Sequence, residues 1–346
     1  MGRRRKRHIT WGILIGALCA ATVALILVTG ALFMNREDTE VVEAETAEVT
    51  DDDTSSVDSV DSCLRSASVG AEPRSPGPCA PSRGSSDVMA EETVPSDTPT
   101  PFTFVDVFGE EYETTLNPAV EKNPYDPAAY TTGDGRIRYE DDTYISDFGI
   151  DVSHHQGRID WERAAADGVT FAFLRIGYRG YGQEGNLRPD TEFERNIAGA
   201  QAAGIDVGVY LFSQAINEEE AAEEARFVIE RLQGHSLQLP VIYDPEHILD
   251  APARTDDVPG EQVTKNTIVF CRMIEEAGYE AGIYSNMLFE AFEFDLAQLS
   301  DYPLWYADYE PLPQTPYHFV YWQYSNEGRV SGVDGVVDLN IRMRKK

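Results

Sequence analysis

From residue 148 onward the chain alternates between short apolar runs and amphipathic stretches. The apolar runs are rich in β-branched and aromatic residues, and they read FGIDV (148–152), TFAFLRI (170–176), IDVGVYLF (205–212) and LQLPVIY (237–243). The stretches between them have a helical period, and each ends near a glycine, as helix C-termini commonly do. Strand and helix in strict alternation predict a parallel sheet with helices outside it.

The alternation changes toward the end of the chain. A helical pattern at 261–278 and an apolar run at 279–285 continue it, but three further runs follow with little helix between the last ones, at 303–307, 318–324 and 335–339. Eight strands of this kind predict an α/β, TIM-like (β/α) barrel whose final third has lost its helices. An open doubly wound sheet is the alternative, although no Gly-rich phosphate loop follows the first strand.

The N-terminus has a different pattern. Residues 9–34 contain no charged side chain and would form a helix of about 39 Å, against a hydrocarbon layer of about 30 Å. The basic tail, residues 1–8, precedes them, so we expect a transmembrane signal anchor with a cytoplasmic N-terminus and the rest of the chain outside the cell membrane. A cleaved signal peptide is the alternative. Gly12 and Gly16 form a weak G-x-x-x-G signal for helix dimerisation.

Two segments separate this span from the alternating region. Residues 35–100 are acidic and rich in Ser, Thr and Pro, which predicts a disordered stalk that its own charge keeps extended. Residues 101–145 contain aromatic residues and turn signals, and we expect an ordered lead-in there. Cys63 and Cys79 could pair in an oxidising exterior, whereas Cys271 fits a small core position.

The charge excludes one class of partner. The formal net charge is −32, and residues 101–346 hold 44 acidic and 19 basic side chains. Such a surface repels a phosphate backbone, so we expect no nucleic-acid partner.

Acidic and aromatic side chains recur where the predicted strands end. In a parallel barrel these ends meet at one rim, which carries the active site. A solvated helix face does not explain acids at the same end of successive strands. The residues at these ends are Asp151, Tyr210, Asp244, Glu246, Tyr284, Asp308, Trp322, Gln323 and Asp338.

The stretch VIYDPE at 241–246 supplies two of these acids. The pattern D-x-E occurs elsewhere in this acidic chain, so its position after an apolar run is what matters. In extended backbone, Asp244 and Glu246 project to the same side, and Pro245 favours that geometry. Two neighbouring carboxylates do not both ionise easily, so one of them stays protonated near neutral pH. This is the equipment needed to protonate a glycosidic oxygen.

From Phe148 to Lys346 the chain resembles the glycoside hydrolase family 25 lysozymes, the Chalaropsis-type muramidases. The matching stretches, in order, are GIDVSHHQGRIDW, FAFLRIGYRG, VGVYLFS, VIYDPE, GIYSN, PLWYADY, YWQYS and VDLN. The resemblance implies a (β/α)5(β)3 barrel over residues 146–346. It also implies cleavage of the β-1,4 bond between N-acetylmuramic acid and N-acetylglucosamine in peptidoglycan.

The resemblance also assigns roles. It makes Glu246 the general acid and Asp244 the residue that assists the substrate's acetamido group, and it places Asp151 and Asp308 in the same acidic cleft. We prefer substrate-assisted hydrolysis. The residues expected to bind substrate are Tyr178, Tyr210, Tyr284, Trp322, Gln323 and Asp338. No cofactor is implied, and His154 and His155 lack the further ligands of a zinc site.

Two other functions stay open. One is a tethered wall-binding protein without catalysis, although no matched acid is replaced by an amide. The other is a hydrolase of a different amino-sugar polymer, because neither fold nor D-x-E pattern fixes the sugar. The anchor and stalk suggest remodelling of the cell's own wall.

Overall fold

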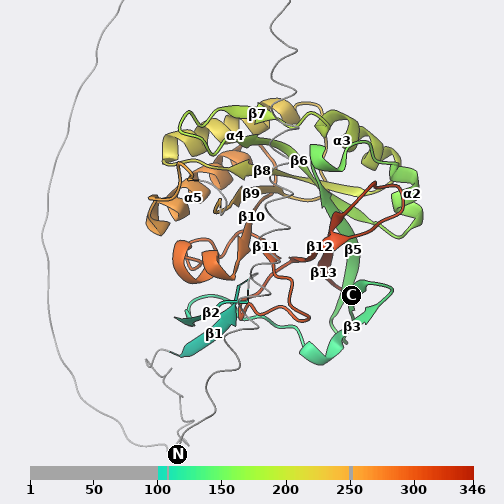
Figure 1. Cartoon of the computed structure of the whole chain (residues 1–346), viewed down its shortest axis with the longest axis horizontal. Coiled ribbons are helices and arrows are strands. Elements are labelled where there is room, and N and C mark those ends of the chain that lie inside the picture. The colour runs from blue at the N-terminus through green and yellow to red at the C-terminus, as the bar shows by residue number, and fades with distance from the viewer. Residues whose placement is uncertain (1–99, 107–108, 249–251) are drawn as a thin grey trace, which may run out of the picture. The chain divides into compact units, whose positions relative to one another are not determined.

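The computed structural model describes residues 100–106, 109–248 and 252–346, and its centre is a closed barrel (Figure 1). Eight strands close the barrel, and they correspond to the eight apolar runs of the sequence. They are β5 (Tyr144–Val152), β6 (Phe171–Arg179), β8 (Asp206–Ser213), β9 (Val241–Pro245), β10 (Ala281–Asn286), β11 (Leu304–Ala307), β12 (Tyr321–Gly328) and β13 (Val337–Lys345). The short strand β7 (Leu187–Pro189) lies outside the ring, paired with β6.

Seven of the barrel strands run in the same direction. Each pair of neighbours from β5 through β6, β8, β9, β10 and β11 to β12 is parallel, and β13 closes the ring antiparallel to both β12 and β5. The barrel-like α/β fold predicted from the sequence is therefore confirmed. The open doubly wound alternative is wrong, because β5 pairs with β6 as well as β13.

Helical segments follow the first five strands only. They are a 3-10 helical turn, η2 (His154–Gln156), then α2 (Trp161–Ala166), α3 (Phe193–Ala202), α4 (Glu218–Leu232), α5 (Gly260–Glu276) and a π-helical turn, η3 (Phe289–Glu293). The sequence explains α4 well: Asn217 caps it through the amide of Glu220, and three glutamates in its first turn suit the positive end of the helix dipole. Its buried residues recur at helical spacing and face the barrel.

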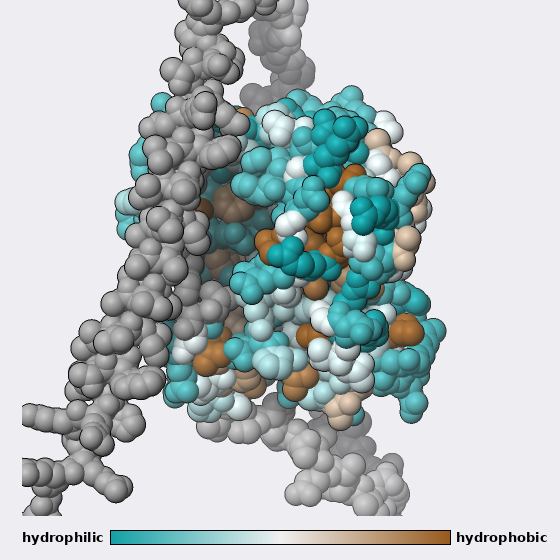
Figure 2. All heavy atoms as spheres, turned by 45° about the vertical axis from the view of Figure 1, so that its right-hand side comes forward, coloured by the Kyte–Doolittle hydropathy of each residue, from teal (hydrophilic) through white to brown (hydrophobic). Residues whose placement is uncertain are grey.

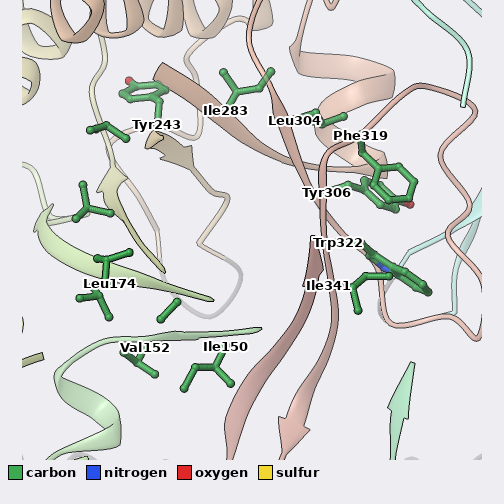
Figure 3. Close-up of a cluster of buried hydrophobic side chains, with 14 of the residues drawn as sticks. Ile150, Val152, Leu174, Tyr243, Ile283, Leu304, Tyr306, Phe319, Trp322 and Ile341 are labelled. Carbon is green, nitrogen blue, oxygen red and sulfur yellow. The ribbon is translucent and has the colours of Figure 1, made fainter. Parts of the chain in front are cut away.

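The strands bury side chains on both faces. Inside the barrel lies a small aromatic cluster that includes Phe171, Phe173, Trp305 and Tyr321, with the rings of Phe173 and Trp305 stacked at 4.6 Å. The alternate residues belong to the larger core between the strands and the outer layer, where Leu304, Tyr306, Phe319 and Trp322 are seen together in Figure 3. This two-residue period decides which strand residues can reach the rim of the barrel.

The lead-in packs onto the barrel. It forms two hairpins, β1 (Pro101–Val105) with β2 (Glu111–Thr115) and β3 (Tyr130–Gly133) with β4 (Arg136–Tyr139). Phe104, Tyr125 and Tyr139 are buried in the same core as the barrel strands. The Tyr125 hydroxyl donates a 2.7 Å hydrogen bond to the carbonyl oxygen of Phe319. The lead-in and the barrel therefore share one hydrophobic core.

Several predictions concern residues outside the described part. The basic tail, the membrane span with Gly12 and Gly16, the stalk, and Cys63 and Cys79 all lie within residues 1–99. Of the helices that the structure describes, none has the length and apolarity to cross a bilayer. Cys271 is fully buried, as predicted for a core position. Figure 2 shows that hydrophilic residues cover most of the face it presents, with smaller hydrophobic areas between them.

Candidate active site

A cavity of about 270 Å³ lies at the carboxyl ends of the parallel strands. Four carboxyl groups converge on it from three strands: Asp151 from β5, Asp244 and Glu246 from the end of β9, and Asp338 from β13. Asp151 and Asp338 stand opposite each other in the antiparallel β5–β13 pair. The other lining residues are Ser153, His155, Gln156, Arg175, Tyr210, Phe212, Tyr284, Trp305, Tyr309 and Gln323.

Asp308 is placed differently from the prediction. It does not line the cavity, because Leu304, Tyr306 and Asp308 follow the outward face of β11, whereas Trp305, Ala307 and Tyr309 follow the inward face. Its carboxylate accepts hydrogen bonds from the Tyr306 hydroxyl at 2.7 Å and from the main-chain N–H of Gln314 at 2.8 Å. Asp308 holds the loop after β11 together, and Asp338 is the fourth acid of the cavity.

Two expected substrate-binding aromatics also lie elsewhere. Trp322 is fully buried on the outward face of β12, where its indole N–H donates to the Asp308 carbonyl oxygen and its ring meets Tyr130 edge-on. Tyr178 follows an irregularity in β6 and lies beneath the Arg175 guanidinium, 5.2 Å from ring centre to carbon. Of the predicted substrate-binding set, Tyr210, Tyr284, Gln323 and Asp338 do line the cavity.

A hydrogen-bond network fixes the Asp151 carboxylate. One of its oxygens accepts from the side-chain amides of Gln323, at 2.9 Å, and Asn340, at 2.7 Å. Asn340 in turn accepts from the Trp305 indole at 2.8 Å, and Gln323 accepts from the Tyr284 hydroxyl at 3.2 Å. Burial raises the pKa of Asp151 to about 6, against the effect of its amide donors, which favour the ionised form.

The other three carboxyl groups hold protons more strongly. Burial, together with the charge of Asp151, raises the pKa of Glu246 to about 7, although a hydrogen bond from Tyr284 lowers it. Burial and the charges of Asp151 and Glu246 raise the pKa of Asp338 to about 8. Burial and the charge of Glu246 also raise the pKa of Asp244 well above its ordinary value. The cavity therefore contains protonated carboxyl groups at neutral pH.

One oxygen of Asp244 is unusual among the described residues. Asp244 is 4% exposed, and its Oδ1 atom is buried without a hydrogen-bond partner in this part of the chain. A buried polar atom without a partner costs about 1–3 kcal/mol. A donor on a bound molecule would remove that cost, so Asp244 offers an acceptor to a ligand.

Arg175 and Tyr309 line the cavity but were not among the site residues predicted from the sequence. Arg175 lies at its edge, held by the buried carboxylate of Asp190 at 2.8 Å and hydrogen-bonded to His154. His155 also lines the cavity, and burial lowers its pKa, which favours the neutral ring. The two-residue period of a strand could have indicated Arg175, because Phe171, Phe173 and Arg175 lie on the same face of β6.

Gln214, just after β8, anchors the backbone at Glu246. Its side-chain amide donates a 2.7 Å hydrogen bond to the Glu246 carbonyl oxygen and accepts a 2.8 Å hydrogen bond from the Thr255 hydroxyl. The Arg254 guanidinium donates to the Gln214 carbonyl oxygen and pairs with Glu220 at 2.7 Å. Gln214 is 1% exposed, so these bonds form away from water and fix the segment that carries Glu246.

Replacing Gln214 with Met should lower kcat about tenfold and leave KM nearly unchanged, since each lost hydrogen bond contributes about 0.5–1.5 kcal/mol. The reason is that Glu246 would lose its fixed position while the rest of the cavity stays intact. Steady-state kinetics and a melting curve would check this. Thr255→Val, which removes only one of the bonds, is the matched control with a smaller expected effect. A variant that melts earlier but keeps its kcat would show a purely structural role for Gln214.

No cluster of three or more His, Cys, Asp or Glu side chains arranged to hold a metal ion occurs in the part of the chain that the structure describes. A carboxyl-lined cavity at the carboxyl ends of a parallel barrel, with one acid of pKa near neutrality, defines the site type of a glycoside hydrolase.

Comparison with known proteins gives the family. Residues 150–333 match the model of the glycosyl hydrolases family 25, and the chain belongs to this family of glycoside hydrolases. Lysozyme M1 of Streptomyces globisporus is 28% identical over 212 residues, which cover 56% of this chain and 66% of that protein. The autolytic lysozyme of Clostridium acetobutylicum is 25% identical over 193 residues, 56% of this chain and 54% of that protein.

Two further proteins are similar to the chain. YegX of Escherichia coli strain K12 is 29% identical over 203 residues, which cover 56% of this chain and 68% of that protein. The structure of the modular autolysin LytC from Streptococcus pneumoniae superposes with a TM-score of 0.50 at 25% identity, and covers 69% of this chain and 56% of that one. The chain thus spans little more than half of LytC and of the clostridial lysozyme.

Proposed function

We propose that this protein is an N-acetylmuramidase that cleaves the β-1,4 bond between N-acetylmuramic acid and N-acetylglucosamine in peptidoglycan. The observation that carries the proposal is the pair Asp244 and Glu246 at the end of β9, in a cavity that raises the pKa of Glu246 to about 7. Two relatives carry the name lysozyme, and LytC has been solved in complex with a synthetic peptidoglycan ligand. These names support peptidoglycan as the substrate.

In the proposed reaction Glu246 donates its proton to the glycosidic oxygen as the bond from that oxygen to the sugar C1 breaks. The acetamido oxygen of the same sugar attacks C1, and Asp244 accepts a hydrogen bond from the acetamido N–H through its unpartnered oxygen. Asp151, which has the lowest pKa of the three carboxyl groups Asp151, Glu246 and Asp338, stabilises the positive charge at C1. Water then attacks C1 and opens the five-membered ring that the acetamido group has formed with it. Glu246 takes a proton from this water and is ready for another cycle. Isolation of a sugar ester on Asp244 or Asp151 would contradict this route.

Digestion of purified peptidoglycan and of chitin, side by side, tests the substrate. We expect fragments from peptidoglycan only, with N-acetylmuramic acid at the new reducing end in mass spectra. Release of N-acetylglucosamine ends, or cleavage of chitin, would assign a different amino-sugar bond. Binding to peptidoglycan without any fragments would make this a wall-binding protein.

The dependence of kcat/KM on pH should reflect the pKa values of the acids in the cavity. We expect kcat/KM to fall as pH rises above about 7, because Glu246 loses the proton it must donate, and to fall below about 6, because Asp151 becomes neutral. Tyr284→Phe removes the hydrogen bond that lowers the pKa of Glu246, so the alkaline limb should move to higher pH. Rates on soluble glycan strands across pH 4–9 would measure both limbs. A shift to lower pH in the variant would show that another group controls the alkaline limb.

We also propose that residues 9–34 anchor the protein in the cell membrane, with the hydrolase domain outside, acting on the cell's own wall. The apolar span and the preceding basic cluster support this topology. Fractionation of cells should find the protein in the membrane pellet, and protease added to intact cells should cleave the hydrolase domain. Protein released to the medium with an N-terminus after residue 34 would contradict the anchor.

A further inference from the structure

A groove of about 890 Å³ runs along α2, from Asp160 at the start of the helix to Asp167 at its end. Its walls are the segment after β5, helix α2, and the loop between β12 and β13. Because β12 runs parallel to β11, that loop lies at the carboxyl ends of the parallel strands. We call it the arginine groove; its lining residues include Arg158, Arg163 and Arg329.

Hydrogen bonds join the two sides of the arginine groove. The main-chain N–H of Asp160 donates to the Gly332 carbonyl oxygen at 2.9 Å, and that of Ser331 donates to the Asp167 carboxylate at 2.9 Å. Gly332 has a φ of 93°, and a β-carbon there would lie 2.3 Å from the Asp160 carbonyl oxygen. Only glycine allows the loop to approach α2 this closely, so Gly332 fixes the position of the loop that forms one wall of the groove.

Positive charge is unpaired in the arginine groove. The three arginine side chains are exposed, and within the described residues none of them forms an ion pair. This is notable in a domain where acidic side chains greatly outnumber basic ones. Three acids also line the groove: Asp160 caps α2, Asp167 pairs with Arg136 at 2.8 Å, and Asp334 is exposed in the loop between β12 and β13. The Arg329 guanidinium donates a 3.3 Å hydrogen bond to the Gly335 carbonyl oxygen, whereas the Arg158 and Arg163 side chains have no hydrogen bond within the described residues. Guanidinium groups placed like those of Arg158 and Arg163 are suited to bind carboxylates.

Apolar side chains lie between these arginines. Ile159, Val330 and Val333 line the arginine groove and belong to the core, each at least nine tenths buried. A groove with a branched aliphatic base and a cationic rim fits a short peptide that combines methyl side chains with free carboxylates. A bare glycan strand has neither, so it is a poorer match.

The arginine groove adjoins the catalytic cavity through two chain segments. Gln156 lines the cavity and Arg158 lines the groove, two residues further on. Gly335 lines the groove and Asp338 lines the cavity, three residues further on. The linings of the cavity and of the groove are therefore neighbours at two points of the chain.

We propose that the arginine groove binds the stem peptide of peptidoglycan, the alanine- and carboxylate-containing peptide attached to N-acetylmuramic acid. This rests on the proposed function of the cavity and adds the peptide as a second recognised part of the substrate. The carboxylates of the peptide pair with Arg158 and Arg163, and its methyl groups contact the apolar base. The protein then distinguishes peptide-bearing strands from strands without peptide.

The test uses the full-length protein and two soluble substrates, glycan strands with their stem peptides and the same strands after an amidase has removed them. The double variant Arg158→Gln/Arg163→Gln should lower kcat/KM on peptide-bearing strands about tenfold or more, since two charge-assisted bonds are lost, and leave the bare strands unaffected. Arg226→Gln/Arg272→Gln, on α4 and α5, is the matched control. It removes the same charge from two other exposed arginines and should change neither rate.

A second measurement does not depend on turnover. The affinity of the full-length protein for a disaccharide that carries a stem peptide should exceed its affinity for the bare disaccharide, and only the groove variant should lose the difference. Equal losses on both substrates, or none on either, would overturn the groove assignment. A wild-type protein that cleaves neither substrate would contradict the proposed function instead, and the affinity difference would then decide the groove by itself.

Discussion

Glu246→Gln should lower the rate of peptidoglycan cleavage by about a hundredfold to ten-thousandfold, the range that a positioned general acid contributes. The amide keeps the size and hydrogen-bonding of the side chain but has no proton to transfer to the glycosidic oxygen. Substrate affinity should stay within a few-fold of the wild type. Reducing-end release and binding to insoluble peptidoglycan, measured on the same preparation, would separate the two effects.

Glu310→Gln is the matched control for this variant. Glu310 also ends a D-x-E pattern, with Asp308, but it lies exposed in the loop after β11 and does not line the cavity. We expect its activity to equal that of the wild type. A Glu246→Gln protein that retains more than a tenth of the wild-type rate would remove Glu246 from the role of general acid.

Removing the lead-in should prevent the barrel from folding as a soluble monomer. A domain that begins at residue 146 loses the large buried side chains Phe104, Tyr125, Ile137 and Tyr139, which belong to the barrel's own core. Burying such a side chain contributes about 1.5–3 kcal/mol, so together they contribute on the order of 6–12 kcal/mol. A whole domain is usually stable by only about 5–15 kcal/mol.

The control is a protein that begins at residue 100 and keeps both hairpins. It should show one cooperative melting transition, whereas the protein that begins at residue 146 should aggregate or melt without a transition. Expression yield, size-exclusion chromatography and circular dichroism would compare them. Equal melting temperatures for the two proteins would mean that the lead-in packs on the barrel without stabilising it.

Most of the barrel could be predicted because its strands and helices have different periods in the sequence. The site was predicted in part. Asp151, Asp244, Glu246 and Asp338 do meet in one cavity, since each lies at a strand end and points inward. Asp308 was misplaced because the reasoning used its position along the chain and not its place in the alternation of β11. Counting from Trp305 would have put Asp308 on the outward face and Tyr309 on the inward one.

Other features were not accessible from local pattern. The Gln314 side chain forms two 2.9 Å hydrogen bonds with the backbone of Val105 in β1, 209 residues away, and donates to Asp308 at 3.3 Å. These hydrogen bonds of Gln314 join the first hairpin to the loop after β11. No periodicity within either segment indicates the other, so only the folded chain shows why Asp308 faces the lead-in.

The strand that closes the barrel, β13, is also the last barrel strand to be synthesised. Asn340 holds Asp151 across 189 residues of sequence, and Asp338 completes the set of four acids. The cavity therefore does not exist until β13 has left the ribosome and has inserted between β5 and β12. A contact of such long sequence separation forms late and slowly. The nascent chain therefore lacks the cavity of four acids until its last barrel strand has folded into place.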